Sequence, residues 1–169
     1  MTGPDLSHLS PQDAVVAFRS YPRRYAAEIE GFVSDDDADE LAARIGPDGV
    51  SAALVISEVG RTWAVLGGAL DQVLRRDDAV LHPAITDPAQ RHWDTPPADS
   101  VADGIDELRH EAEALAILVE GVHSAGDWSR SAAVAGGGSV TALDVVKDAV
   151  AVGADGLTRV RATLAAVRR

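Results

Sequence analysis

The segment Thr141–Val167, TALDVVKDAVAVGADGLTRVRATLAAV, carries the longest uninterrupted helical pattern in the chain. Thr141 and Asp144 form a capping box at its start, in which each side chain satisfies a free backbone N–H group. Its apolar positions recur at alternating steps of three and four residues, so they lie on one stripe of an α-helix. A stripe of this kind must be buried, and the helix is therefore expected to pack against others. The stripe consists of Leu143, Val146, Val150, Gly153, Leu157, Val160, Leu164 and Val167.

A second helix is expected near the start of the chain, over residues 11–32. Ser10 is its predicted N-cap, and Pro11 occupies the first helical position, where the missing N–H costs nothing. Pro22 lies in the middle and should either kink the helix or mark the true start of its second half. The acidic run at residues 34–37 is predicted to break the helix, and residues 38–45 to form one or two short helical turns.

Two more amphipathic stripes cover residues 52–76 and 100–122, again with alternating steps of three and four. The segments between the helices, residues 77–99 and 124–139, are rich in proline, glycine and polar side chains and are expected to be long loops. No segment shows good strand-like alternation. Four long helices with one apolar stripe each predict an all-α fold, a four-helix bundle, with residues 1–169 forming a single domain.

Composition limits the range of functions. The chain has 15 basic and 27 acidic residues, a net charge of −12, and no cysteine. Such a surface repels phosphate backbones and anionic lipid, so neither nucleic acid nor a membrane is expected as a partner. The first residues lack the charged and apolar regions of a signal peptide, and the predicted location is the cytoplasm.

Three passages of the chain resemble motifs of a known family. Arg19–Arg24 (RSYPRR) is similar to a "YPRR" segment of a first helix, and Asp127–Arg130 (DWSR) to a "DW.R" element before a last helix. Thr141–Val146, followed by Gly153 and Leu157, is similar to the start of that last helix. Together they resemble the DinB-like superfamily of four-helix bundles, which includes mycothiol-dependent maleylpyruvate isomerases and bacillithiol transferases. The resemblance covers nearly the whole chain in order and length.

The resemblance implies a divalent metal between the second and last long helices, held by one histidine on the former and a His/Glu–His pair four residues apart on the latter. A thiol would bind at the open coordination positions. Neither helix contains a histidine here, so the metal site is expected to have degenerated, leaving no metal and no cofactor. The corresponding positions are Glu58 or Val59, Ala151 or Val152, and Asp155 or Gly156.

Carboxylates could in principle replace the histidines. Glu58 and Asp155 each adjoin one of the vacated positions, but Asp155 lies nearly opposite the apolar stripe, where solvated charge is expected. Glu58 flanks its own stripe and is the better candidate for a pocket residue and for a general acid or base. Trp63, about one turn beyond Val59, is predicted to fill part of the vacated space and to leave a small, mainly apolar pocket. The predicted pocket-lining residues are Val59, Trp63, His92, Trp93, Trp128, Val152, Asp155 and Gly156.

Two functions remain open at this point. In the first, the bundle performs no chemistry and serves as a small-molecule-binding or dimerising scaffold, with a helix-face homodimer as the expected assembly. In the second, the protein is an enzyme, metal-independent or with a carboxylate-bound metal, that acts on a small molecule or a low-molecular-weight thiol. Glu58 would then be the acid or base, assisted by His92 or Asp155. A deep polar cavity at Glu58, with Trp63 packed elsewhere, would favour the enzyme.

Overall fold

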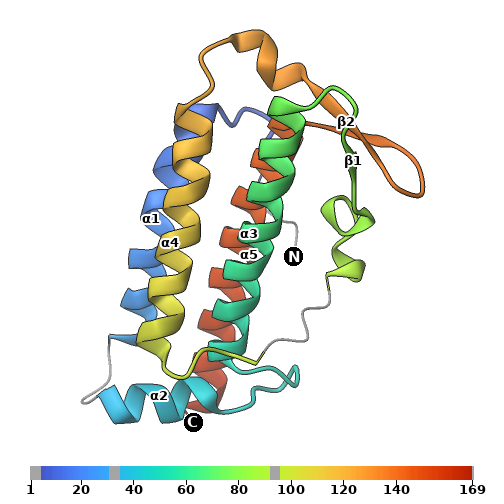
Figure 1. The fold of residues 1–169 in the computed structure, drawn as a ribbon. Helices are drawn as coiled ribbons and strands as arrows, with labels where there is room; N and C mark the ends of the chain where they lie inside the picture. Colours follow the sequence, from blue (N-terminus) through green and yellow to red (C-terminus); the bar gives the residue numbers. More distant parts are fainter. Residues whose placement is uncertain (1–4, 31–34, 92–95, 169) are drawn as a thin grey trace.

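The fold is mostly helical, with a small sheet at one end (Figure 1). The computed structural model describes residues 5–30, 35–91 and 96–168. This part of the chain forms five α-helices: α1 (Pro11–Ile29), α2 (Asp35–Ala43), α3 (Ala52–Arg75), α4 (Val101–Glu120) and α5 (Ala142–Val167).

The four long helices pack side by side around one hydrophobic core. Helix α3 contacts both α4 and α5, and α1 contacts the same two helices from the other side. In Figure 1, α3 and α4 run in one direction while α1 and α5 run in the other. Because α3 and α4 follow each other in sequence and yet are parallel, residues 76–100 must return along the length of the helices. The part of this crossover connection that the structure describes after α3, residues 76–91, runs down one side of the molecule in Figure 1.

The predicted helix starts are confirmed at their caps. Ser10 caps α1 in a box with Asp13, and Thr141 caps α5 in a box with Asp144. Ser100 accepts a hydrogen bond from the Asp103 N–H at the start of α4. The backbone of α1 continues through the buried Pro22, so a separate start at that proline is wrong.

Helix α2 begins at Asp35, inside the acidic run that was expected to break the preceding helix. Acidic residues are favourable in the first turn of a helix, because the amino end of the helix dipole is positive. Asp39 of this helix also reaches α4, where its carboxylate accepts a hydrogen bond of 2.8 Å from the Val101 N–H. The short helix, which also contacts α3 and α5, therefore closes one end of the core.

The expectation of a fold without strands is wrong in detail. Strand β1 (Val80–Leu81) pairs in parallel with β2 (Ser131–Val134), which forms an antiparallel hairpin with β3 (Ser139–Thr141). The strands are too short for a recognisable alternation in sequence, although β2 does alternate exposed and buried residues. The predicted loops also contain three 3₁₀ turns, η1 (Pro83–Ile85), η2 (Pro88–Gln90) and η3 (Ala125–Ser129).

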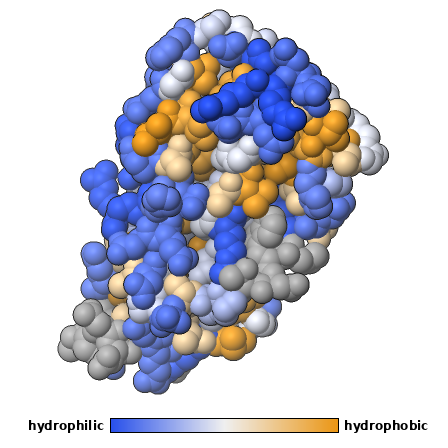
Figure 2. Space-filling model, in the orientation of Figure 1, coloured by the Kyte–Doolittle hydropathy of each residue, from blue (hydrophilic) through white to orange (hydrophobic). Residues whose placement is uncertain are grey.

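Hydrophilic side chains cover most of the face shown in Figure 2, with hydrophobic groups gathered in patches. Within the described residues, α3 is the one helix long and apolar enough to cross a membrane. Its most apolar window is 56% buried inside the protein. Packing in the core therefore accounts for its composition, and the cytoplasmic location stays a prediction.

Candidate functional site

The site is built around one stretch of α5, residues 148–159, whose inner side faces the core. Gly153 and Gly156 are placed where neighbouring side chains approach the helix most closely. A Cβ atom on Gly153 would lie 2.7 Å from Cε2 of Tyr21 and 2.8 Å from Cζ2 of Trp63. A Cβ atom on Gly156 would collide with the Tyr25 hydroxyl and with a Val59 methyl group. The two glycines therefore make room for side chains from α1 and α3.

Three aromatic side chains on this inner side donate hydrogen bonds to carbonyl oxygens of α5. Trp63 Nε1 lies 2.8 Å from the Ala149 oxygen, and Tyr21 Oη lies 3.1 Å from the Val150 oxygen. Tyr25 Oη lies 2.8 Å from the Gly153 oxygen. Burial raises the pKa of both tyrosines, most strongly that of Tyr25. These side chains, here called the aromatic cluster (Tyr21, Tyr25 and Trp63), form a dry and fully bonded interior.

Trp63 therefore is not a pocket-lining residue. Its side chain is fully buried, and its ring makes an edge contact with Phe18 at a centroid distance of 5.9 Å. Its ring packs beside Gly153. The space beside Gly156 is taken by Val59 and Tyr25 instead, because these side chains lie closer to that turn of α5.

The outer side of the same stretch forms a pocket of about 270 Å³ between α3, α5 and η2. The structure brings together in its wall five of the residues predicted from sequence. Thr62, Pro88, Arg91, Asp148, Ala151 and Arg159 complete the wall. The predicted residues are Glu58, Val59, Val152, Asp155 and Gly156.

About half of the lining of the pocket is polar, so the prediction of a mainly apolar pocket does not hold. Glu58 and Arg159 form an ion pair across it, with 3.3 Å between Oε2 and Nη1. Arg91 and Asp148 form a second ion pair in the wall. The helical wheel correctly placed Asp155 away from the apolar stripe. It could not show that the crossover connection would lie over that side and turn a solvated face into a pocket.

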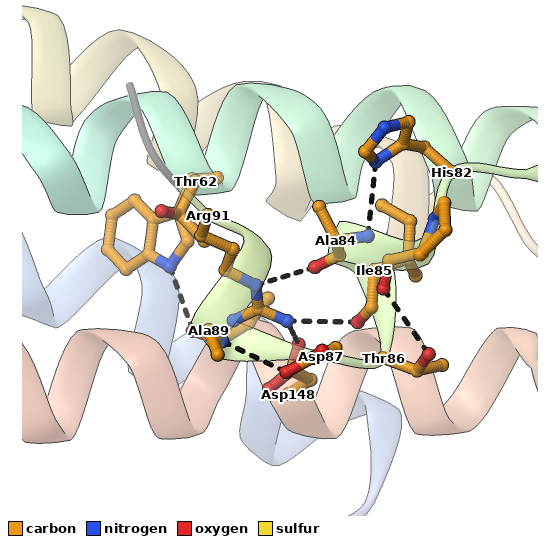
Figure 3. Close-up of polar contacts among 12 residues, drawn as sticks. Thr62, His82, Ala84, Ile85, Thr86, Asp87, Ala89, Arg91 and Asp148 are labelled. Atoms are coloured by element: carbon orange, nitrogen blue, oxygen red, sulfur yellow. Dashed lines mark hydrogen bonds and ion pairs between the residues drawn. The ribbon is translucent and has the colours of Figure 1, made fainter. Parts of the chain in front are cut away.

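Arg91 attaches the crossover connection to α5 (Figure 3). Its Nε donates to the Ala84 oxygen at 2.7 Å, and its Nη2 donates to the Ile85 oxygen at 2.9 Å. The same guanidinium is paired with Asp148, and only 9% of the Arg91 side chain is exposed. His82 supports the turn by accepting a hydrogen bond from the Ala84 N–H. Arg91 is therefore a structural clamp that sets one wall of the pocket.

The remaining predicted residues do not meet at the pocket. Trp128 lies in η3, where it packs against the core near the start of α5, and it is absent from the pocket wall. His92 and Trp93 lie outside the described residues. Sequence reasoning missed Arg91 and Arg159 as site residues. One signal for Arg159 was available, since it follows Asp155 by four residues and so shares its helix face.

The residues present do not fit the divalent metal that the family resemblance implies. Among the described residues, no three His, Cys, Asp or Glu side chains gather closely enough to hold an ion. Glu58 is paired with Arg159 and Asp148 with Arg91, so two of the three carboxylates in the wall already have a counter-charge. That leaves Asp155 alone, and a divalent ion needs several such ligands.

No known family model matches the chain, and no curated protein is significantly similar to it. The likeness to DinB-like proteins therefore stays a resemblance, and the function must be argued from the pocket itself.

Proposed function

We propose that this chain is a DinB-like four-helix bundle in which a metal-free pocket for a small molecule replaces the metal site. The four long helices support the bundle, because they pack side by side around one hydrophobic core. The observation that carries the proposal is the position of the pocket. Its wall contains Glu58, Val59, Val152, Asp155 and Gly156, which are the positions where the family would place its ligands.

The floor and mouth of this pocket suit binding more than chemistry. Val59 and Gly156 close the floor against the aromatic cluster, while charged groups of both signs surround the opening. A volume of about 270 Å³ lies just below the roughly 300–1,000 Å³ that is usual for ligand pockets. The ligand is therefore a molecule smaller than most cofactors.

The alternative of an enzyme gains no support from Glu58. A carboxyl group that acts as a general acid or base near neutral pH usually lies in dry, apolar surroundings. The Glu58 side chain is 36% exposed and is paired with Arg159. The pocket is also not the deep polar cavity that would favour an enzyme, because Val59 and Tyr25 fill the space next to Gly156 behind its wall. The binding function is therefore the better supported of the two.

Binding can be tested on isotope-labelled protein by following backbone amide signals during titration with a library of small polar molecules. The proposal expects at least one molecule to shift the signals of Val59, Thr62 and Gly156 while leaving those of the distant β2–β3 hairpin unchanged.

Metal analysis of untagged protein should find less than one zinc, nickel or iron ion per chain. An ion held at one per chain through chelator dialysis would contradict the metal-free pocket.

The expected homodimer has a candidate face on α1 and α4. Val16 and Ile117 are 69% and 59% exposed. Arg19, one turn beyond Val16, bonds to Glu113 and Glu120 on either side of Ile117, so both apolar side chains lie on one outer face. Burying such a pair in a self-complementary contact is favourable. Light scattering at micromolar concentration should report a dimer that Ile117→Lys dissociates, and a wild-type monomer would contradict the expectation.

A further inference from the structure

We infer that the ligand of the pocket is a small zwitterion, with its carboxylate bound by Arg159 and its ammonium group bound by Glu58 and Asp155. This inference rests on the proposed binding function and specifies its ligand class. It depends on which charged groups of the pocket are already engaged and which are available to a ligand.

Arg91 and Asp148 are not available. The guanidinium of Arg91 is used by two backbone oxygens and by Asp148, and its side chain is 9% exposed. Removing Asp148 from this arrangement would leave a nearly buried cation without its counter-charge, which is costly. This pair therefore forms the wall, and the ligand must be recognised by the other charges.

Arg159 and Asp155 are available. Within the described part of the chain, the guanidinium of Arg159 has one hydrogen bond, the 3.3 Å contact from Nη1 to Glu58. The Asp155 carboxylate has no hydrogen bond or ion pair to any described residue. The two side chains are four residues apart on α5 and both border the pocket. The pocket thus presents a guanidinium with free donors next to a carboxylate with free oxygens, on one helix face.

The Glu58–Arg159 contact can open to admit a ligand. Its side chains are 36% and 45% exposed, and it consists of one long hydrogen bond where a guanidinium can offer two. Ion pairs of this kind at a surface contribute little to stability. A carboxylate entering between the partners would replace the single contact of Arg159 with a bidentate one. The released Glu58 would then face the ammonium group together with Asp155.

The charge balance favours a zwitterion over a simple anion or cation. After the Arg91–Asp148 pair is set aside, the pocket retains two carboxylates and one guanidinium. A simple anion is opposed by both carboxylates and by the net charge of −12. A simple cation is repelled by the Arg159 guanidinium and gives that guanidinium no carboxylate to bind. Only a ligand with both charges satisfies all three groups.

The test uses three zwitterions of increasing charge separation, namely glycine, β-alanine and 4-aminobutyrate. Each is compared with its matched acid and amine, for example butyrate and butylammonium for 4-aminobutyrate. Dissociation constants are measured from the amide signals of Val59, Thr62 and Gly156. The best zwitterion should bind at least about tenfold more tightly than its matched acid and its matched amine, since each lacks one charge-assisted contact.

Variants assign the contacts. Arg159→Gln and Asp155→Asn should each weaken the best zwitterion by about tenfold, and Arg159→Gln should leave the matched amine unaffected or bound more tightly. The matched control is Arg161→Gln. Arg161 lies on α5, like Arg159, but away from the pocket, and it forms a similar exposed ion pair with Glu28 of α1. It should not change binding. Melting temperatures confirm that each variant folds.

The outcomes separate this inference from the proposed function. If an acid, an amine or an uncharged molecule shifts the pocket signals as strongly as every zwitterion, the ligand class is wrong and the binding function stands. If no molecule of the wider library shifts them, the binding function itself is wrong. If Arg161→Gln weakens binding as much as Arg159→Gln, the effect is one of overall charge and the assigned contacts are wrong.

Discussion

The two sides of α5 between Asp148 and Arg159 differ in almost every physical respect. The inner side is dry, contains two glycines, and has its carbonyl oxygens bonded by the aromatic cluster. The outer side is open to solvent and carries charged groups. One of them, Asp155, has no hydrogen bond to any described residue. One helix thus separates a surface that fixes the fold from a surface that can bind.

The difference shows how one stretch of helix can serve two purposes. On the inner side, Tyr25 and Val59 fill the space next to Gly156, while the outer side remains open as a pocket. Substitutions on the inner side should therefore change stability, and substitutions on the outer side should change binding.

The largest effect is expected for Trp63→Ala. This change removes a fully buried ring and its hydrogen bond to the Ala149 oxygen, so the free energy of unfolding should fall by about 3–5 kcal/mol. Urea denaturation measures the change. Trp128→Ala is the control, because Trp128 is only partly buried and should cost much less. Equal losses for the two variants would contradict the special role of the inner side.

Gly153→Ala is expected to lower the free energy of unfolding by a smaller amount, while its control variant should raise it. The added methyl group would lie within 2.8 Å of Tyr21 and Trp63 and should cost about 1–3 kcal/mol by overpacking. Gly68→Ala in α3 has nothing within 4 Å of the new Cβ atom and should stabilise the helix by about 0.5–1 kcal/mol. An increase in the free energy of unfolding for Gly153→Ala would show that the aromatic cluster is not closely packed against α5.

The tyrosines should make the inner side sensitive to high pH. The chain has two tyrosines, and burial raises the pKa of both. Their contribution to stability is present below about pH 10, the value of an unfolded tyrosine, and is lost as the pH rises toward the folded pKa. Absorbance of tyrosinate should therefore appear above pH 10 only together with unfolding. Tyr25→Phe should cost about 1 kcal/mol at pH 7 for its hydrogen bond and reduce the loss at high pH. Free titration at pH 10 in the folded state would contradict this.

The smallest effect on stability is expected on the outer side, for Glu58→Gln. The Glu58–Arg159 contact is long and partly exposed, so its loss should change the free energy of unfolding by no more than about 0.5 kcal/mol. The same urea denaturation measures it, with Glu28→Gln, which breaks the Arg161 pair, as a reference. A decrease of more than about 1 kcal/mol in the free energy of unfolding would mean that Glu58 stabilises the fold. It would contradict the assignment of stability to the inner side of α5 and binding to the outer side.

Local patterns in the sequence account for the helices. Caps such as Ser10 and Thr141 act within a single turn, and apolar stripes repeat within a single helix, so both are visible without tertiary knowledge. The strand Ser131–Val134 is too short to show such a pattern. It forms because β1 and β3 supply hydrogen bonds on both of its edges.

The candidate site was predictable only at the positions that the family resemblance marks. Glu58 and Asp155 could be placed near a pocket because each adjoins one of these positions. Arg91 could not, since it lies in the crossover connection and meets Asp148 across 57 residues of sequence. Nothing in the local composition around Arg91 indicates that contact. It becomes visible only when the connection is seen to lie over α5 (Figure 3).

The order of the helices along the chain has a consequence for how the protein is made. Glu58 and Arg159 are 101 residues apart, so the pocket cannot exist until the last of the four long helices has been synthesised and docked. Until then α1, α3 and α4 expose the apolar faces that α5 will cover, including the ring of Trp63. Chains synthesised from the amino terminus hold such surface open for seconds. The growing chain is therefore most exposed to misassociation, and most in need of chaperones, just before α5 leaves the ribosome.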